Sequence, residues 1–484
     1  MPSSRCLYVP TCAHPLKQSV AERAASGIIV TSSRNAARRT AVRTIRMTDV
    51  DADRQLADLR AALGLEQGLV ADWQKAIANT RSPLETVREV LHAVRTRGDA
   101  AVTEYTERFD KVQLSPAQFR VAQADMDAAA RTMPANVIEA MKRAIENIRR
   151  YQGKTMACDP ADVVVGGRRL SMAYRTLRRV GVYVPGGATA YPSSVLMAAV
   201  PAQVAGVEEV VVLSPPTQDG QIRTPILAAC AVAGIREVYR LQGVAGIAAL
   251  AYGTETIRPV DKIVGPGNQF IQLAKKEVQG TVDIDSFAGP SEVLVIADES
   301  ADARCIALDL LSQAEHNPGC CILVTDDEGL RRRIEAEIDV QVRQLAQGDV
   351  VARALDRFSA MILVRDMDEA CRVSNYLAPE HLQIVTASPR SLLPKITAAG
   401  AVFLGSSTPV AVGDYIAGPS HTLPTGGTAR FASGLSANDF RKRMSVIEYT
   451  AEALAEDAPH IVALAELERL EAHARSVTAR LKKP

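Results

Sequence analysis

The chain has 484 residues, of which 47% are hydrophobic and 23% are charged, so it is a globular protein with enough material for more than one domain. The 56 lysines and arginines are balanced by 55 acidic residues, and only 4% of the residues are aromatic. Because nucleic acids bind to basic faces and to aromatic side chains, this composition argues against a nucleic-acid partner and favours a small-molecule ligand.

Residues 1–46 differ from the rest, because they carry eight lysines and arginines against the single acid Glu22. This pattern resembles an organelle transit peptide, although an upstream start codon before Met47 or a disordered bacterial leader would look the same. In each case we expect the segment to lie outside the fold. No apolar stretch reaches the roughly 18 residues that span a bilayer, so we expect no membrane partner. The eight cysteines form no Cys-x-x-Cys pair, which favours the reducing cytoplasm, with a plastid or other organelle as the alternative.

From about Asp51 to Tyr151, apolar residues at spacings of three and four predict helices. From Gly181 onward, short β-branched runs between glycines and prolines predict strands that alternate with helices, at 182–184, 210–213, 238–241 and 263–264. A second series follows, with strands predicted at 293–296, 322–324, 361–364 and 384–385 and a helix at 303–314. After Phe440 the pattern is helical again and ends in a helix over 463–481.

These elements predict an α/β protein with two tandem Rossmann-like domains, incomplete because no Gly-x-Gly-x-x-Gly is present, and with helical N- and C-terminal segments. The expected divisions are an N-terminal helical segment at 47–78, a discontinuous first α/β domain at 79–182 and 290–430, a second at 183–289, and a C-terminal helical segment at 431–484. Since parallel sheets bind ligands at the carboxyl ends of their strands, we expect the chemistry in the loops that follow the strands.

Four of the seven histidines fall beyond residue 310, namely His316, His381, His421 and His473. Gln313 and His316 lie three residues apart at the end of a predicted helix, where they could bind one ion, although a histidine there can equally cap the helix. Asp414, in a glycine-rich loop, and His473, on the last helix, could complete the set. Imidazole nitrogens with carboxylate and amide oxygens suit zinc.

Glu380 and His381 lie between a predicted helix and a predicted strand, a position suited to acid–base work on one substrate. A hydrated surface glutamate beside a capping histidine would give the same pattern. Three glycine–proline segments also adjoin strands, at 181–187, 264–270 and 287–292, where Asn268 and Ser291 supply hydrogen-bonding groups. These segments could equally be structural turns, and none predicts NAD by itself.

In order and spacing, the chain from about Leu84 to its end resembles the histidinol dehydrogenase family. The resemblance is carried by the segments 181–187, 265–270, 288–292, 312–316, 379–381, 413–421, 423–427 and 468–473. It implies the oxidation of L-histidinol through L-histidinaldehyde to L-histidine, the final steps of histidine biosynthesis. It also implies NAD, one zinc ion per subunit, and a homodimer whose last helices cross to the partner and share the active sites.

The resemblance further implies a role for each candidate residue. His381 would remove the alcohol proton, and Glu380 would activate the water that hydrates the aldehyde. The implied zinc ligands are Gln313, His316, Asp414 and His473. The implied substrate contacts are Ser291, Gln313, His316, His381, Asp414, Glu468 and His473. Tyr183 and Asn268 would contact NAD.

One position departs from the family pattern. The family commonly has a glutamine that contacts NAD in a Gly-Gly-Ala-Gln-Ala run, whereas this chain has Ala245 at that place, in Gln242-Gly243-Val244-Ala245-Gly246. Loss of one neutral hydrogen bond costs about 1 kcal/mol and would weaken NAD binding several-fold. The departure is also compatible with a changed cofactor preference or with a paralogue that oxidises another amino alcohol. A zinc hydrolase that uses Glu380 or Glu315, and a metal-stabilised binding protein, are the alternatives from other classes.

Overall fold

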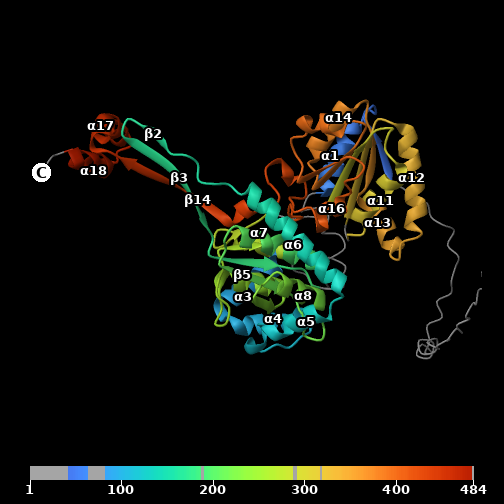
Figure 1. Ribbon diagram of the computed structural model, residues 1–484, viewed down its shortest axis with the longest axis horizontal. Helices are drawn as coiled ribbons and strands as arrows, with labels where there is room; N and C mark the ends of the chain where they lie inside the picture. The colour runs from blue at the N-terminus through green and yellow to red at the C-terminus, as the bar shows by residue number, and fades with distance from the viewer. Residues whose placement is uncertain (1–41, 64–81, 187–189, 287–290, 317–318, 482–484) are drawn as a thin grey trace, which may run out of the picture. The chain divides into compact units, whose positions relative to one another are not determined.

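The computed structural model describes residues 42–63, 82–186, 190–286, 291–316 and 319–481. Two parallel sheets with helices around them confirm the predicted α/β class, and a third, antiparallel sheet is present (Figure 1). Among the described residues, no helix combines the length and the apolar character needed to cross a membrane.

The first parallel sheet has five strands in the order β6-β5-β4-β7-β8. Their bounds are β4 Arg179–Tyr183, β5 Glu209–Ser214, β6 Glu237–Arg240, β7 Lys262–Val264 and β8 Asp283–Ile284. From β4 the chain adds β5 and β6 on one side and then β7 and β8 on the other. The order therefore reverses between β4 and β7, and ligands of open α/β sheets bind at such a point, beyond the carboxyl ends of the strands.

In the part of the chain that the structure describes, eight helices surround this sheet: α3 Pro83–Arg97, α4 Asp99–Asp110, α5 Gln123–Thr132, α6 Ala135–Thr155, α7 Pro192–Val204, α8 Thr224–Val232, α9 Gly243–Tyr252 and α10 Gln269–Val278. The short 3₁₀ helix η1, Pro116–Gln118, also belongs here. Residues 243–251 of α9 are all buried, because α3 packs over them. A helix that is apolar on all sides must be buried on all sides, and α9 is covered by the sheet on one side and by α3 on another.

The helices between residues 83 and 155 therefore belong with the five-stranded sheet, since α3 packs on α9 and α10, α5 on α8, and α6 on α7. This differs from the domain boundaries inferred from the sequence, which grouped 79–182 with 290–430. The apolar face of an amphipathic helix shows that the helix packs against something, but not which sheet it covers.

The second parallel sheet has six strands in the order β1-β11-β10-β9-β12-β13. Their bounds are β1 Arg43–Arg46, β9 Ser291–Ala297, β10 Gly319–Thr325, β11 Ala360–Leu363, β12 His381–Val385 and β13 Ala401–Leu404. The helices of this part are α1 Ala52–Leu63, α11 Ala303–Ala314, α12 Glu328–Val342, α13 Gly348–Phe358, α14 Met367–Leu377, α15 Pro389–Leu392 and α16 Val410–Tyr415, with 3₁₀ helices η2 Leu393–Lys395, η3 Thr428–Arg430 and η4 Ala437–Phe440.

Strand β1 corrects the expectation that residues 1–46 lie wholly outside the fold. Arg43–Arg46 pair in parallel with Ala360–Leu363, and Ile45 is fully buried. The partner strand lies more than 300 residues further along the chain, so no local pattern could show the pairing. Residues 1–41 of the expected leader lie outside the described residues, as do residues 64–78 of the expected N-terminal helical segment.

The antiparallel sheet has the order β14-β3-β2, with β2 Val163–Val165, β3 Arg168–Thr176 and β14 Arg441–Tyr449, and it is followed by α17 Ala451–Leu467 and α18 Glu471–Leu481. The C-terminal segment is therefore not wholly helical, because β14 is a strand that pairs with β3 along its full length. The helix predicted over 463–481 is also interrupted, at Arg469, whose φ is 60°. The apolar periodicity of the sequence continues across Arg469, so it did not indicate that one helix ends there and another begins.

Candidate active site

The candidate catalytic residues meet at the amino ends of the six-stranded sheet. Ser291 is the first residue of β9 and His381 the first of β12, with Glu380 directly before it, while Gln313 lies near the end of α11, which leads into β10. This corrects the expectation that the chemistry follows the strands. Since α11 and α14 end at this edge, the negative ends of their helix dipoles favour a bound cation there.

A continuous hydrogen-bond chain joins these side chains. The Gln313 Nε2 donates to the Ser291 hydroxyl, which in turn donates to Glu380 Oε2 over 2.7 Å. The backbone N–H of Glu292 donates to the same carboxylate oxygen over 2.9 Å. Two donors thus hold one oxygen of Glu380, and its Oε1 accepts no hydrogen bond from the described residues.

The ring of His381 is held in one tautomer. Its Nδ1 lies 2.9 Å from the carbonyl oxygen of Glu292, which can only accept, so Nδ1 carries a proton. In the neutral ring, Nε2 then carries the lone pair. This atom is buried, lies 3.6 Å from Asp414 Oδ1 and has no hydrogen-bond partner among the described residues. Burial alone would lower the pKa of His381, but the negative charges of Glu380 and Asp414 outweigh it and raise the pKa to about 10.

Glu292 is a site residue that the sequence reasoning missed. Its side chain is 1% exposed, and its Oε1 accepts a hydrogen bond of 2.6 Å from the N–H of Gly426. Burial, with the nearby charge of Glu380, raises its pKa to about 8, so the carboxyl is mainly protonated at neutral pH. The only signal in the sequence was an acid inside the apolar run of β9.

The residues expected to bind metal are partly brought together. Gln313 uses Nε2 on Ser291, which leaves its Oε1 as the atom that a metal would bind. Burial would raise the pKa of Asp414, but its contact with His381 and the charges of His421 and His316 outweigh burial and lower it. His316 and His421 therefore lie within electrostatic range of Asp414. No signal had singled out His421 for a role.

A sequence profile described as histidinol dehydrogenase matches residues 74–481 of the chain. The chain is 48% identical to a protein named histidinol dehydrogenase from Rhodopirellula baltica, over 89% of this chain and 95% of that protein, and 46% identical to one from Bacillus subtilis, over 83% and 94%. The crystal structure of histidinol dehydrogenase from Elizabethkingia anophelis superposes with a TM-score of 0.82 at 33% identity, covering 91% of this chain and 98% of that one. The chain belongs to the histidinol dehydrogenase family. The resemblance seen in the sequence is confirmed.

Two residues that the histidinol dehydrogenase pattern places in the site are not joined to it within this chain. Glu468 and His473 are exposed, and the hydrogen bonds of their backbone groups stay within α17, α18 and the turn between them. Within the described residues, no three His, Cys, Asp or Glu side chains lie close enough together to hold a metal ion. Gln313, His316 and Asp414 would therefore need a further ligand.

The residues that the resemblance would assign to the cofactor belong to the five-stranded sheet and to the helices that follow its strands. Tyr183 ends β4 and Asn268 caps α10 after β7, so the two flank the point where the strand order reverses. Asn268 Oδ1 accepts the N–H groups of Phe270 and Ile271, which gives this residue a structural role as well. Ala245 is fully buried in α9, and its N–H is capped by Gln242 Oε1 at 2.9 Å.

Proposed function

We propose that the protein oxidises L-histidinol through L-histidinaldehyde to L-histidine, with NAD as the hydride acceptor and a zinc ion that positions the substrate. The observation that supports this most is the placement of His381, whose Nδ1 is held by the Glu292 carbonyl and whose buried Nε2 has no hydrogen-bond partner among the described residues. A general base needs such an orienting partner and a free lone pair. A cation held by Asp414 would offset the negative charge that raises the pKa of His381 and would leave Nε2 with its lone pair at neutral pH. Membership of the histidinol dehydrogenase family indicates that the substrate is L-histidinol.

The residues present fit zinc. An amide oxygen from Gln313, an imidazole from His316 and a carboxylate from Asp414 are ligand types that zinc accepts, and a catalytic site keeps a position open for the substrate. Glu380 and Asp414 both face His381, a surplus of negative charge that a cation would balance. When bound, zinc would hold the imidazole and amino nitrogens of the substrate and keep the aldehyde from escaping.

The chain's own residues would then move the protons. His381 Nε2 takes the proton of the alcohol as hydride leaves for NAD. Ser291 and the Glu292 N–H hold Glu380 by one oxygen, so the other oxygen can accept a proton from the water that hydrates the aldehyde. A second hydride transfer, from the hydrate to a second NAD, then gives the carboxylate, and Glu380 or His381 takes the hydroxyl proton. Both oxidations can use one site, because the two residues lie side by side.

We further propose that the enzyme is a homodimer in which Glu468 and His473 of each chain complete the partner's site. The antiparallel sheet and the C-terminal helices expose large apolar side chains, with Val164 61%, Ile447 70% and Leu467 79% exposed. Exposed large apolar side chains gathered on one small sheet and the helices that follow it are typical of an interface. A second copy that covers it would also supply the missing metal ligand.

The experiment that tests this function is to measure the NADH produced per L-histidinol consumed, with purified protein supplied with zinc and NAD and with a chelator-treated sample alongside. We expect two NADH per substrate and loss of activity on chelation. His381→Asn should lower turnover far more than zinc content, whereas His473→Asn should mainly lose zinc. If wild type forms no NADH, the substrate is another amino alcohol or the site is that of a hydrolase, and the proposal fails.

A further inference from the structure

Lys275, on α10, is a lysine whose side chain is fully buried. Its ammonium forms an ion pair with the carboxylate of Asp285, whose side chain is only 4% exposed. Both charges lose their hydration on burial, so such a pair is often no more stabilising than two apolar side chains of similar volume. The contacts of the pair indicate a role other than stability.

Both members of the pair bind the same glycine. The backbone N–H of Gly265 donates to Asp285 Oδ2 over 2.7 Å, and Lys275 Nζ donates to the carbonyl of Gly265 over 3.0 Å. Gly265 directly follows β7, and its φ of +117° lies in a region that residues with side chains rarely adopt. The pair therefore fixes the two peptide groups that flank Gly265, at the point where the chain leaves the strand.

The same ammonium also binds the end of the neighbouring strand. Lys275 Nζ donates to the carbonyl of Ser286 over 3.3 Å, and Asp285 and Ser286 follow β8, which pairs with β7. An ammonium has three N–H donors, and this one has three oxygen partners among the residues that the structure describes. One side chain of α10 thus joins the ends of two strands to the helix that follows the turn at 265–268.

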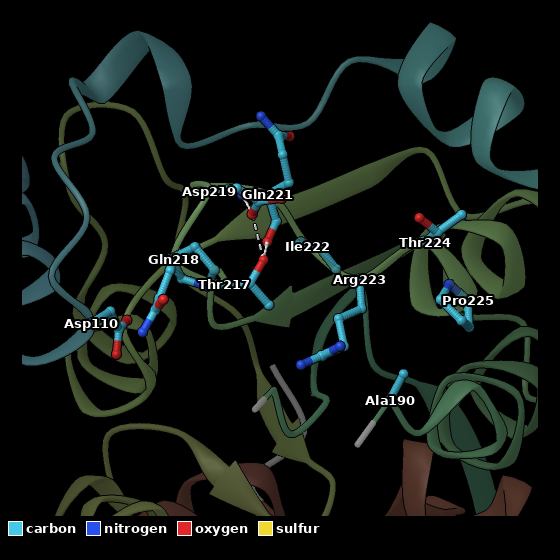
Figure 2. A pocket seen from close by; sticks show the side chains of 11 residues that line it. Asp110, Ala190, Thr217, Gln218, Asp219, Gln221, Ile222, Arg223, Thr224 and Pro225 are labelled. Carbon is cyan, nitrogen blue, oxygen red and sulfur yellow. Dashed lines mark hydrogen bonds between the residues drawn. The ribbon is translucent and has the colours of Figure 1, made fainter. Parts of the chain in front are cut away.

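This turn lies at the carboxyl edge of the five-stranded sheet, where the proposed function places the cofactor. A Cβ on Gly265 would lie 2.2 Å from the carbonyl oxygen of Tyr183, so the turn is in close contact with the end of β4. The same edge has room for a ligand, since a cavity of about 920 Å³ lies between Asp110 and the loop at 216–225 that follows β5 (Figure 2). A displaced Gly265 would therefore alter the surface that faces a bound cofactor.

We propose that Lys275 and Asp285 are positioning residues for the cofactor, and that the pair holds the turn at 265–268 in the conformation that binds NAD. The inference rests on the proposed function, since it assumes NAD. Neither side chain would touch the cofactor, because both are almost fully buried. The substrate side of the site should not depend on the pair, because Ser291 is held by hydrogen bonds to Gln313 and Glu380.

The test compares wild type with Lys275→Met and with the double variant Lys275→Met/Asp285→Asn. The single variant leaves a buried carboxylate without its partner, whereas the double variant removes both charges and keeps an oxygen that can accept the N–H of Gly265. The double variant should regain part of the stability but not the cofactor affinity, because Lys275 no longer donates to the Gly265 carbonyl. Calorimetric titration should give a Kd for NAD about 10-fold higher than that of wild type in both variants. The KM for NAD should rise in parallel, with the KM for L-histidinol unchanged.

Lys262→Met is the matched control, because it makes the same substitution at a buried lysine on β7 itself. Lys262 begins the strand, at the opposite edge of the sheet, where it donates to the carbonyl of Asp439 over 2.6 Å and pairs with Asp283. Its loss should lower the Tm but leave the Kd for NAD at the wild-type value. Circular dichroism at the titration temperature checks that each variant is folded.

A wild-type Kd for NAD in the double variant, or an equal rise in Lys262→Met, overturns the positioning role even if wild type oxidises L-histidinol. If the variants lose affinity for NAD as expected but wild type forms no NADH from L-histidinol, the positioning role stands and the proposed function fails. If wild type does not bind NAD, both fail.

Discussion

Replacing Glu292 by glutamine should alter how the stability of the protein depends on pH. The folded chain holds the proton of Glu292 up to a pKa of about 8, whereas the ordinary value is 4.5. Between these values the unfolded chain has released a proton that the folded chain retains, so stability falls as pH rises through this window. Each pH unit corresponds to about 1.4 kcal/mol, so Glu292 should reduce stability by roughly 2–3 kcal/mol between pH 5 and pH 7.

Glutamine isolates this contribution because it keeps the shape of the side chain and does not ionise. Its Oε1 can still accept the hydrogen bond from Gly426, which Glu292 accepts at 2.6 Å. We therefore expect the free energy of unfolding of Glu292→Gln, minus that of wild type, to increase by roughly 2–3 kcal/mol from pH 5 to pH 7. Urea unfolding at both pH values measures the difference, at fixed protein and zinc concentrations so that linked binding cancels.

Glu328→Gln is the control, because folding lowers the pKa of Glu328 whereas it raises the pKa of Glu292. Arg331, Arg332 and Arg46 lower the pKa of Glu328 to about 2, so its contribution to stability is complete above about pH 5 and is lost only in stronger acid. The free energy of unfolding of Glu328→Gln, minus that of wild type, should therefore stay constant from pH 5 to pH 7. A flat difference for Glu292→Gln as well, or one that decreases, would show that Glu292 is already ionised in the folded protein and would refute the reasoning.

Three further outcomes follow from other parts of the fold. Lys275→Met should lower the free energy of unfolding by about 3–5 kcal/mol in urea, since it leaves the buried Asp285 without its ion-pair partner, and adding Asp285→Asn should recover part of the loss. A chain begun at Met47 should melt at a lower temperature and aggregate more than one begun at residue 40, because it lacks β1 and exposes the edge of β11; equal melting would contradict this. Gly265→Ala should lower the free energy of unfolding by about 1–3 kcal/mol or more, since φ is +117° and a Cβ would lie 2.2 Å from the carbonyl oxygen of Tyr183. It should also weaken NAD binding measured by titration, and unchanged binding would show that this loop does not contact the cofactor.

Several features could be predicted from the sequence because they depend on neighbours along the chain. Periodicity was enough for the alternation of helices and strands, and adjacency was enough to pair Glu380 with His381. The spacing of Gln313 and His316 at a helix end indicated a shared direction. The ordered motifs together indicated the family, since eight segments in sequence are far more specific than any one of them.

The tertiary structure decided what depends on contacts between distant residues. It placed the catalytic residues at the amino ends of β9 and β12, which no strand pattern distinguishes from the carboxyl ends. It paired Arg43–Arg46 with a strand more than 300 residues away and covered the five-stranded sheet with α3–α6. It also buried Glu292 beside Glu380, and the protonation of Glu292 follows from that burial. Periodicity reports which face of an element is apolar, whereas burial and charge depend on which elements meet, and only the folded chain sets that.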